Sequence, residues 1–143
     1  MYPEEIVKPC REELTSIGIK ELKAANEVDD AIKTKPGTTL VVVNSVCGCA
    51  AGGARPGVRL ALQHDKLPSQ LITVFAGVDN EAVERARSHM VGYPPSSPSV
   101  ALFKDGELVY MMERHDIEGT HPEEIAQKLK DAFDTHCSQT ASA

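Results

Sequence analysis

At 143 residues, with 41% hydrophobic and 25% charged side chains, the chain is long enough for one domain with its own core and too short for two of ordinary size. Its net charge of -6, with basic residues scattered among acidic ones, argues against a nucleic-acid partner. No stretch approaches the ~18 apolar residues of a membrane helix, and the amino terminus lacks the apolar core of an export signal. We therefore expect a cytoplasmic protein with no membrane partner.

The first third of the chain predicts a helix, a short strand, a second helix and a buried strand. The first helix would end at Gly18 and either begin near Lys8 or be kinked at Pro9, with one apolar stripe at helical spacing: Ile6, Cys10, Leu14 and Ile17. Residues 19–22 suit a strand and residues 26–34 a helix. Residues 38–44, TTLVVVN, form an unbroken β-branched run, which is typical of a central strand covered on both faces.

The remainder alternates helices and strands and closes with a hairpin. The turn Asp105-Gly106 is a strong hairpin signal, and three prolines make residues 92–98 irregular. The expected elements are a helix at 54–64, a strand at 71–76, a helix at 81–90 capped by Asp79 or Asn80, strands at 100–103 and 107–112, and a helix at 122–133.

This order predicts an α/β fold with a mixed central sheet flanked by helices, because crossover helices imply parallel pairing and the hairpin adds an antiparallel edge. We expect one domain over residues 1–137, of which residues 1–18 form an N-terminal helical extension. Residues 138–143 would be a disordered tail.

The chemistry is concentrated at Cys47-Gly48-Cys49, which follows the buried strand and precedes a helix. Unpaired N–H groups at a helix start stabilise negative charge and so lower the pKa of a thiol there. Cys47 is the better candidate for the attacking nucleophile, with Cys49 close enough to resolve the mixed disulfide. Gly48 would permit the tight ring that a disulfide between them requires.

Other interpretations of these cysteines remain open. The pair could bind zinc or copper(I) with Cys10 or Cys137, although no second cysteine or histidine pair stands nearby, or it could be two small residues packed at a turn. Cys10 lies on the expected inward stripe and would be a packed thiol. Cys137 is expected to be more exposed, as a third redox cysteine or as an ordinary surface thiol.

Arg55 and His115 are further candidates for the site. Arg55 follows the thiols on the expected helix and could attract an anionic small thiol or steady the thiolate, or be a solvated helix charge. His115 is the most interesting histidine, but a capping or surface role fits it better than catalysis.

Residues 97–109, SPSVALFKDGELV, resemble the thioredoxin pattern of a cis-proline that opens a strand before a Lys-polar-Gly turn and a return strand. The resemblance runs over residues 19–133. It implies that Pro98 is cis and lies with Ser97 against the thiol pair, where the two would help to position an incoming sulfur. The chain departs from thioredoxin in having no tryptophan and no carboxylate on the strand before the thiols. Proton transfer would then use water, Asn44, Ser45 or a more distant group.

Residues 43–56, VNSVCGCAAGGARP, resemble the CGC centre of the bacilliredoxins, as do residues 11–15, 95–99 and 114–119. This resemblance implies a thiol-disulfide oxidoreductase without a bound cofactor, which removes the small thiol bacillithiol from mixed disulfides on proteins. Its partners would be thiol-modified proteins and the small thiol, while the oligomeric state stays open. The alternatives are a protein disulfide isomerase and a carrier of soft metal ions.

Overall fold

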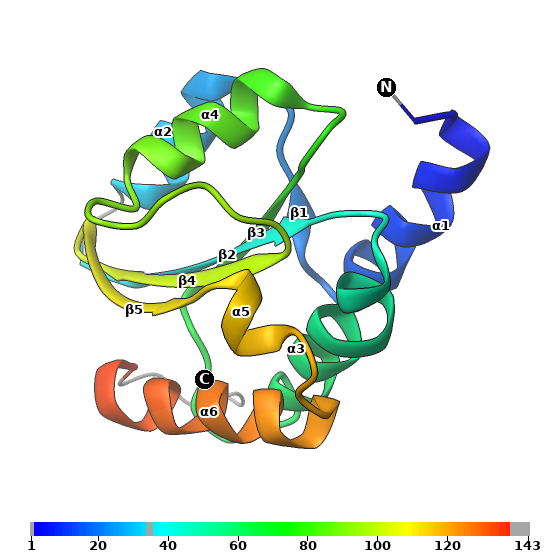
Figure 1. Ribbon diagram of the computed structural model, residues 1–143. Coiled ribbons are helices and arrows are strands. Elements are labelled where there is room, and N and C mark those ends of the chain that lie inside the picture. The colour runs from blue at the N-terminus through cyan, green and yellow to red at the C-terminus, as the bar shows by residue number, and fades with distance from the viewer. Residues whose placement is uncertain (1, 34–35, 138–143) are drawn as a thin grey trace.

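A five-stranded mixed sheet forms the centre of the computed structural model, which describes residues 2–33 and 36–137 (Figure 1). The strands are β1 (Lys20–Glu21), β2 (Thr38–Asn44), β3 (Gln70–Phe75), β4 (Ser99–Lys104) and β5 (Glu107–Met112), in the spatial order β1-β3-β2-β4-β5. β1 and β2 run parallel to β3, whereas β4 is antiparallel to β2 and to β5. The mixed sheet predicted from the sequence is therefore confirmed.

Helices cover both faces of this sheet (Figure 1). They are α1 (Glu4–Thr15), α2 (Ala25–Ile32), the π-helix η1 (Ala50–Ala54), α3 (Arg55–Ala61), α4 (Asn80–Ser88), α5 (Arg114–Ile117) and α6 (Pro122–His136). α2 and α4 pack together on one face, and α3 and α6 pack together on the other. The tail expected at residues 138–143 lies outside the described residues.

β2 is the strand that both layers share. All seven of its residues are buried, as the unbroken apolar run predicts. Leu40 and Val42 belong to the core under α3 and α6, whereas Val41 and Val43 belong to the core under α2 and α4. Because successive side chains of a strand point to opposite faces, this one segment fixes both cores and the position of whatever follows Asn44.

The return hairpin follows the sequence prediction. Lys104 pairs with Glu107, which leaves a two-residue turn. Asp105 has a φ of 52° and Gly106 a φ of 86°, so both turn residues adopt the left-handed conformation that such hairpins favour.

The face of α1 that packs against the protein is not wholly the one that its apolar residues predict. Ile6 is 50% exposed and Cys10 is only partly buried, while Val7, Arg11 and Leu14 face inward. Arg11 donates a hydrogen bond of 2.7 Å to Asp79 and forms an ion pair of 2.7 Å with Glu21.

The expected stripe is confirmed at Leu14 and wrong at Ile6 and Cys10, because the helix turns a paired arginine inward, which a count of apolar residues overlooks. The Asp79 carboxylate accepts the hydrogen bond from Arg11. Asp79 therefore precedes α4 without capping the helix through its side chain. A buried guanidinium needs such partners, since an unpaired charge in the interior is costly.

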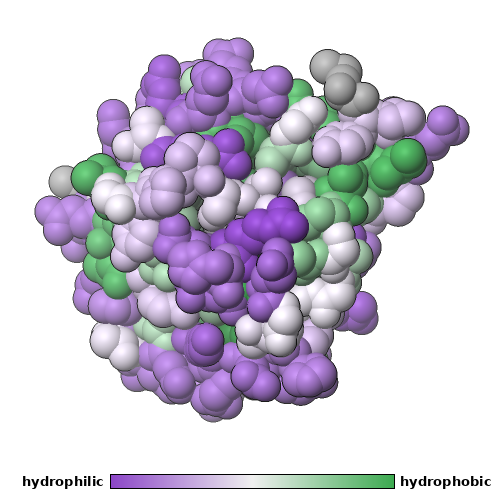
Figure 2. All heavy atoms as spheres, in the orientation of Figure 1, coloured by the Kyte–Doolittle hydropathy of each residue, from purple (hydrophilic) through white to green (hydrophobic). Residues whose placement is uncertain are grey.

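The surface in the view of Figure 2 is mostly hydrophilic, with hydrophobic side chains showing over α1 at the right. The exposed large hydrophobic residues of the described chain are Tyr2, Ile6, Val91 and Tyr93. Across residues 2–33 and 36–137, none of the helices combines the length and the apolar composition that a membrane crossing requires.

α3 packs tightly against α6 at Gly57, which generates a testable prediction. A β-carbon there would lie 2.5 Å from Ile125 Cγ2. We expect Gly57→Ala to lower the free energy of unfolding by about 1–3 kcal/mol through overpacking. Urea unfolding followed by circular dichroism measures this change. Gly52→Ala is the matched control, because its β-carbon would meet no atom within 4 Å. Equal stabilities for the two variants would contradict the packing described.

Candidate active site

The two thiols lie between the end of β2 and a helical segment, as predicted. Cys47 follows the strand by three residues, and its carbonyl accepts hydrogen bonds of 3.1 Å from the N–H groups of Ala50 and Ala51. Cys47 and Cys49 are free thiols, and both are partly exposed. The sulfur atoms therefore stand at the mouth of a helical segment where a substrate can reach them.

The helical segment begins earlier than the sequence indicates, and as a π-helix. The Arg55 N–H donates to the carbonyl of Ala50, five residues back. Pro56 has no N–H to donate to the carbonyl four residues before it, which disfavours a regular α-helix through this stretch. A regular helix starts only at α3, whose first turn contains Pro56.

The sulfur of Cys47 is surrounded by groups that favour its anionic form. The Ser45 hydroxyl donates a hydrogen bond of 3.1 Å to it. Burial by itself raises the pKa of this thiol, but hydrogen bonds from Ser45 and from the N–H groups of Ala50 and Cys49 lower it. The positive charge of Arg114 acts in the same direction, and the pKa of Cys47 lies below its ordinary value. Cys47 is the more nucleophilic thiol of the pair.

Cys49 has the opposite environment. Its thiol donates a hydrogen bond of 3.6 Å to Glu118 Oε2. Burial raises the pKa of Cys49, and Arg114 does not offset the combined effect of burial, the Cys47 sulfur and the Glu118 carboxylate. The Cys49 pKa is thus raised while the Cys47 pKa is lowered, although a single glycine separates the two residues.

Arg114 and Glu118 also lie beside the two sulfur atoms, and sequence reasoning named them only within residues 114–119: Glu118 raises the pKa of Cys49, whereas Arg114 lowers the pKa of both thiols. Arg114 Nε lies 3.1 Å from Glu118 Oε2, and Nη1 lies 4.0 Å from the Cys47 sulfur. Arg114 is the first residue of α5 and Glu118 follows its last, and this four-residue helix is too short for a periodic signal. The capping box formed by Glu113 and Asp116 was the available signal for this helix.

Arg55 lies behind the thiol loop. It is 3% exposed, and its Nη1 donates hydrogen bonds to Asn44 Oδ1 (3.0 Å) and to the Ser45 carbonyl (2.6 Å). Its Nε lies 3.2 Å from Glu13 Oε1. The burial of its guanidinium argues against two of the roles that the sequence left open for Arg55, attraction of a small thiol and a solvated helix charge, and leaves an indirect one, which is to hold the backbone that carries Cys47.

Asn44 completes this support. Its Oδ1 also accepts a hydrogen bond of 2.9 Å from the Ser45 N–H, and its Nδ2 donates to the Cys10 carbonyl at 3.0 Å. Asn44 is 1% exposed, so it fixes the end of β2 and the adjoining part of α1 away from solvent. Of the proton-transfer candidates named from the sequence, Ser45 is the one that contacts the Cys47 sulfur.

The loop before β4 borders the site. The Ser97–Pro98 peptide bond is cis, as predicted. Val43 pairs with Ser99, so Pro98 lies level with Asn44 at the end of β2. The Ser97 carbonyl accepts a hydrogen bond of 3.0 Å from Arg114 Nη1, and Ser97 lines a pocket with Cys47.

Gly48 is exposed, and an added β-carbon would meet no atom within 4 Å. In the dithiol form seen here, space does not require glycine at this position. The need for glycine in the disulfide form stays a prediction.

The other two cysteines differ from their expected settings. Cys10, expected to be packed, is only partly buried, and its thiol donates to the Ile6 carbonyl at 3.4 Å. Cys137, expected to be exposed, is 4% exposed, and burial raises its pKa. Its thiol contacts Thr38 at the opposite end of β2 from the redox loop, roughly 20 Å away along the strand. Cys137 is therefore not placed to take part in exchange with Cys47.

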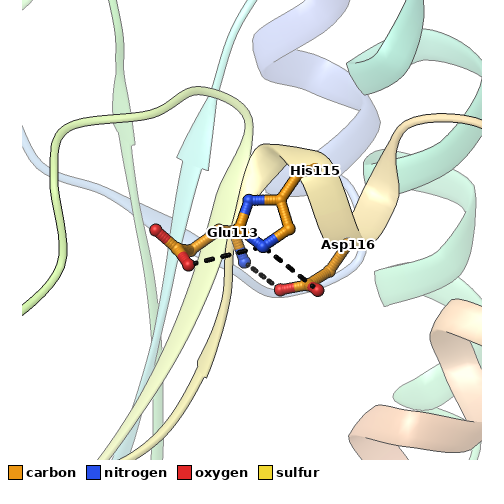
Figure 3. A group of neighbouring side chains, drawn as sticks. All are labelled: Glu113, His115 and Asp116. Carbon is orange, nitrogen blue, oxygen red and sulfur yellow. Dashed lines mark hydrogen bonds and ion pairs between the residues drawn. The ribbon is translucent and has the colours of Figure 1, made fainter.

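Glu113, His115 and Asp116 form a separate group whose side chains point toward one another (Figure 3). His115 Nε2 lies 3.6 Å from an oxygen of each carboxylate, and Asp116 also accepts a hydrogen bond from the Glu113 N–H. Among the described residues, this is the set with atoms close enough to share a metal ion, and it includes no sulfur. His115 itself is exposed, in keeping with the surface role expected for it.

Comparisons with known proteins agree with this geometry. A family model described as Disulphide isomerase matches residues 2–137. The chain is 54% identical over 143 residues to a bacilliredoxin of Koribacter versatilis, covering 100% of this chain and 99% of that protein. It is 56% identical over 134 residues to a bacilliredoxin of Cytophaga hutchinsonii, covering 94% of this chain and 98% of the relative.

Solved structures show the fold. Mitochondrial thioredoxin 3 of Saccharomyces cerevisiae in its oxidized form is similar with a TM-score of 0.55 at 16% identity, over 86% of this chain and 98% of that one. The thioredoxin-like domain of Arabidopsis NCP is similar with a TM-score of 0.59 at 17% identity, over 82% and 78% of the two chains. The thioredoxin-like fold predicted from the sequence is confirmed.

The charge pair of Arg114 and Glu118 leads to a prediction of two opposite shifts. We expect Arg114→Gln to raise the pKa of Cys47, because a nearby positive charge is lost. We expect Glu118→Gln, made in a Cys47→Ser background, to lower the pKa of Cys49. The rate of iodoacetamide alkylation against pH, followed by mass spectrometry of each cysteine peptide, gives both values. At pH 7 the alkylation rate of Cys47 should fall about threefold in Arg114→Gln. Shifts of the same sign in both variants would contradict the account.

Proposed function

This chain belongs to the bacilliredoxin family of thiol-disulfide oxidoreductases, and we propose that it removes a low-molecular-weight thiol from mixed disulfides that this thiol forms with proteins. The observation that carries the proposal is that the surroundings of the two thiols shift their pKa values in opposite directions. Ser45 and Arg114 favour the Cys47 thiolate, while Glu118 holds the proton on Cys49. Cys47 therefore attacks as a thiolate, while Cys49 remains a protonated thiol.

In the first step, the Cys47 thiolate attacks the small-thiol sulfur of the mixed disulfide. A new S–S bond joins Cys47 to the small thiol, and the bond to the protein substrate breaks. The substrate cysteine leaves as a thiolate and takes a proton from solvent. The lowered Cys47 pKa supports this step, because the thiolate is the attacking species.

In the second step, Cys49 loses its proton to solvent and attacks the Cys47 sulfur. A disulfide forms between Cys47 and Cys49, and the small thiol is released. The small thiol leaves as a thiolate and takes a proton from solvent, so the mixed disulfide has gained two electrons and two protons, while the cysteine pair has lost two electrons and the Cys49 proton, and solvent has supplied the other proton. The raised Cys49 pKa slows this step, because only the deprotonated sulfur attacks.

The small thiol that we propose is bacillithiol, which the family resemblance implies. It would act as a co-substrate, and the chain itself would need no bound cofactor. Thiol-capped proteins would be the other partners.

A protein disulfide isomerase is the second candidate, favoured by the description of the matching family model. It would use the same Cys47 attack on a protein disulfide, but would release a rearranged substrate and keep its own thiols reduced. A bacillithiol-capped protein and a scrambled multi-disulfide protein, offered in parallel, distinguish the two activities.

We expect Cys47→Ser to abolish removal of bacillithiol from the capped protein, down to the uncatalysed exchange rate, because the attacking sulfur is gone. Cys49→Ser should accumulate a Cys47–bacillithiol disulfide, which free bacillithiol then resolves. Non-reducing mass spectrometry follows both species. Cys10→Ser is the matched control and should behave as wild type. Full activity of Cys47→Ser would refute the assignment, and activity on the scrambled protein alone would favour the isomerase.

A further inference from the structure

A pocket of about 180 Å³ opens beside the Cys47 sulfur, between the amino-terminal extension and the loop before β4. Its lining includes Tyr2, Gly77, Ser97 and Arg114. We propose that this pocket binds the small-thiol half of the mixed disulfide, with a free carboxylate of the small thiol on Arg114 and its organic part against the ring of Tyr2. The proposal rests on the function proposed above and assigns the part of the site that selects the small thiol.

The ring of Tyr2 lies beside Gly77 at the pocket. A β-carbon on Gly77 would lie 2.8 Å from Tyr2 Cε2, and Gly77 has a φ of +83°, so a side chain at this position would displace the ring. Tyr2 nevertheless remains 46% exposed. An exposed aromatic ring beside a nucleophile offers a flat apolar surface with few torsions to immobilise when a ligand binds.

Arg114 has hydrogen-bonding capacity left for a ligand. A guanidinium carries five N–H donors. Its Nε is used by Glu118, and its Nη1 contacts the Ser97 carbonyl and the Cys47 sulfur. Within residues 2–33 and 36–137, Nη2 donates to no acceptor. Because Nη2 belongs to a cation at the pocket wall, a carboxylate is the group that it would bind most strongly.

A carboxylate distinguishes the two halves of the mixed disulfide. A cysteine inside a protein has its carboxyl group in a peptide bond, whereas a free small thiol derived from cysteine or an acid keeps one. The pocket is also smaller than the 300–1,000 Å³ typical of cavities that enclose a whole ligand, so it suits the thiol end of a small molecule rather than an extended polypeptide. The larger cleft beside Cys49, about 370 Å³, is lined mostly by glycine and apolar residues and offers less to an anion.

The test uses one peptide with a single cysteine, capped either with cysteine or with cysteamine, which differ by one carboxylate. The rate of cap removal, kcat/KM, is measured for each cap by mass spectrometry. We expect wild type to prefer the cysteine cap by about fivefold, the contribution of one partly exposed charged hydrogen bond. Arg114→Gln should bring this ratio close to one. Any general loss of Cys47 reactivity in the variant affects both caps and leaves the ratio unchanged.

Tyr2 is tested with the same probes. Tyr2→Ala should raise KM for both caps several-fold without changing the rate at which iodoacetamide alkylates Cys47, and Tyr2→Phe should restore the wild-type KM. Arg59→Gln, on an exposed position of α3, is the matched charge control and should keep the wild-type ratio.

The possible failures are distinguishable. If wild type leaves the bacillithiol-capped protein of the earlier test intact, the proposed function fails; if it uncaps that protein but removes neither of these two caps, the assignment of this pocket is wrong. If it removes both caps, and Arg114→Gln keeps the wild-type ratio or Tyr2→Ala keeps the wild-type KM, the oxidoreductase activity stands and the assignment of this pocket is wrong.

Discussion

The stabilisation of the Cys47 sulfur by the Ser45 hydroxyl is the interaction on which the rest of the site depends. It requires the chain to turn sharply just after β2, so that a residue two positions before the thiol can donate to it. The same hydroxyl accepts a hydrogen bond of 3.3 Å from the Cys47 N–H, which closes the turn from the other side. One short polar side chain thus shapes the loop and favours the anion that the loop carries.

On its buried side, the turn is held by a polar network rather than by apolar packing. Arg55 binds Asn44 and the Ser45 carbonyl, and an ion pair with Glu13 ties it to α1. Arg11 joins the same helix to β1 and α4 through Glu21 and Asp79. Two buried cations therefore hold the amino-terminal extension against the sheet. Because each buried charge is costly unless it is paired, loss of one partner would loosen both the extension and the redox loop.

Local patterns were enough to predict the parts of the fold that local chemistry determines. The β-branched run at 38–44 gave β2, Asp105-Gly106 gave the hairpin, and the likeness around Ser97-Pro98 gave the cis bond. The predictions that failed concern residues whose contacts lie far away in the sequence. Arg11 is buried because it meets Asp79, sixty-eight residues away. No periodicity of residues 6–17 contains that information.

The same limit explains the site. Cys47 and Cys49 could be selected from their spacing, whereas Arg114 and Glu118 reach them from an element that follows the hairpin, and only the folded chain brings them together. Arg55 was selected for its nearness in sequence and turned out to support the loop from within. Cys137 was expected at the surface because it lies near the end of the chain, but it belongs to the core that includes Leu40 and Val42 of β2.

The most direct test of this account is the pH dependence of Cys47 alkylation, measured residue by residue in wild type and in Ser45→Ala. An ordinary cysteine titrates near about 8.5. We expect the wild-type midpoint below that value, a higher midpoint in Ser45→Ala, and a rate at pH 7 about tenfold lower in the variant, which corresponds to ~1.4 kcal/mol for a hydrogen bond to a charged group. A wild-type midpoint at or above the ordinary value, or one that Ser45→Ala leaves unchanged, would contradict it.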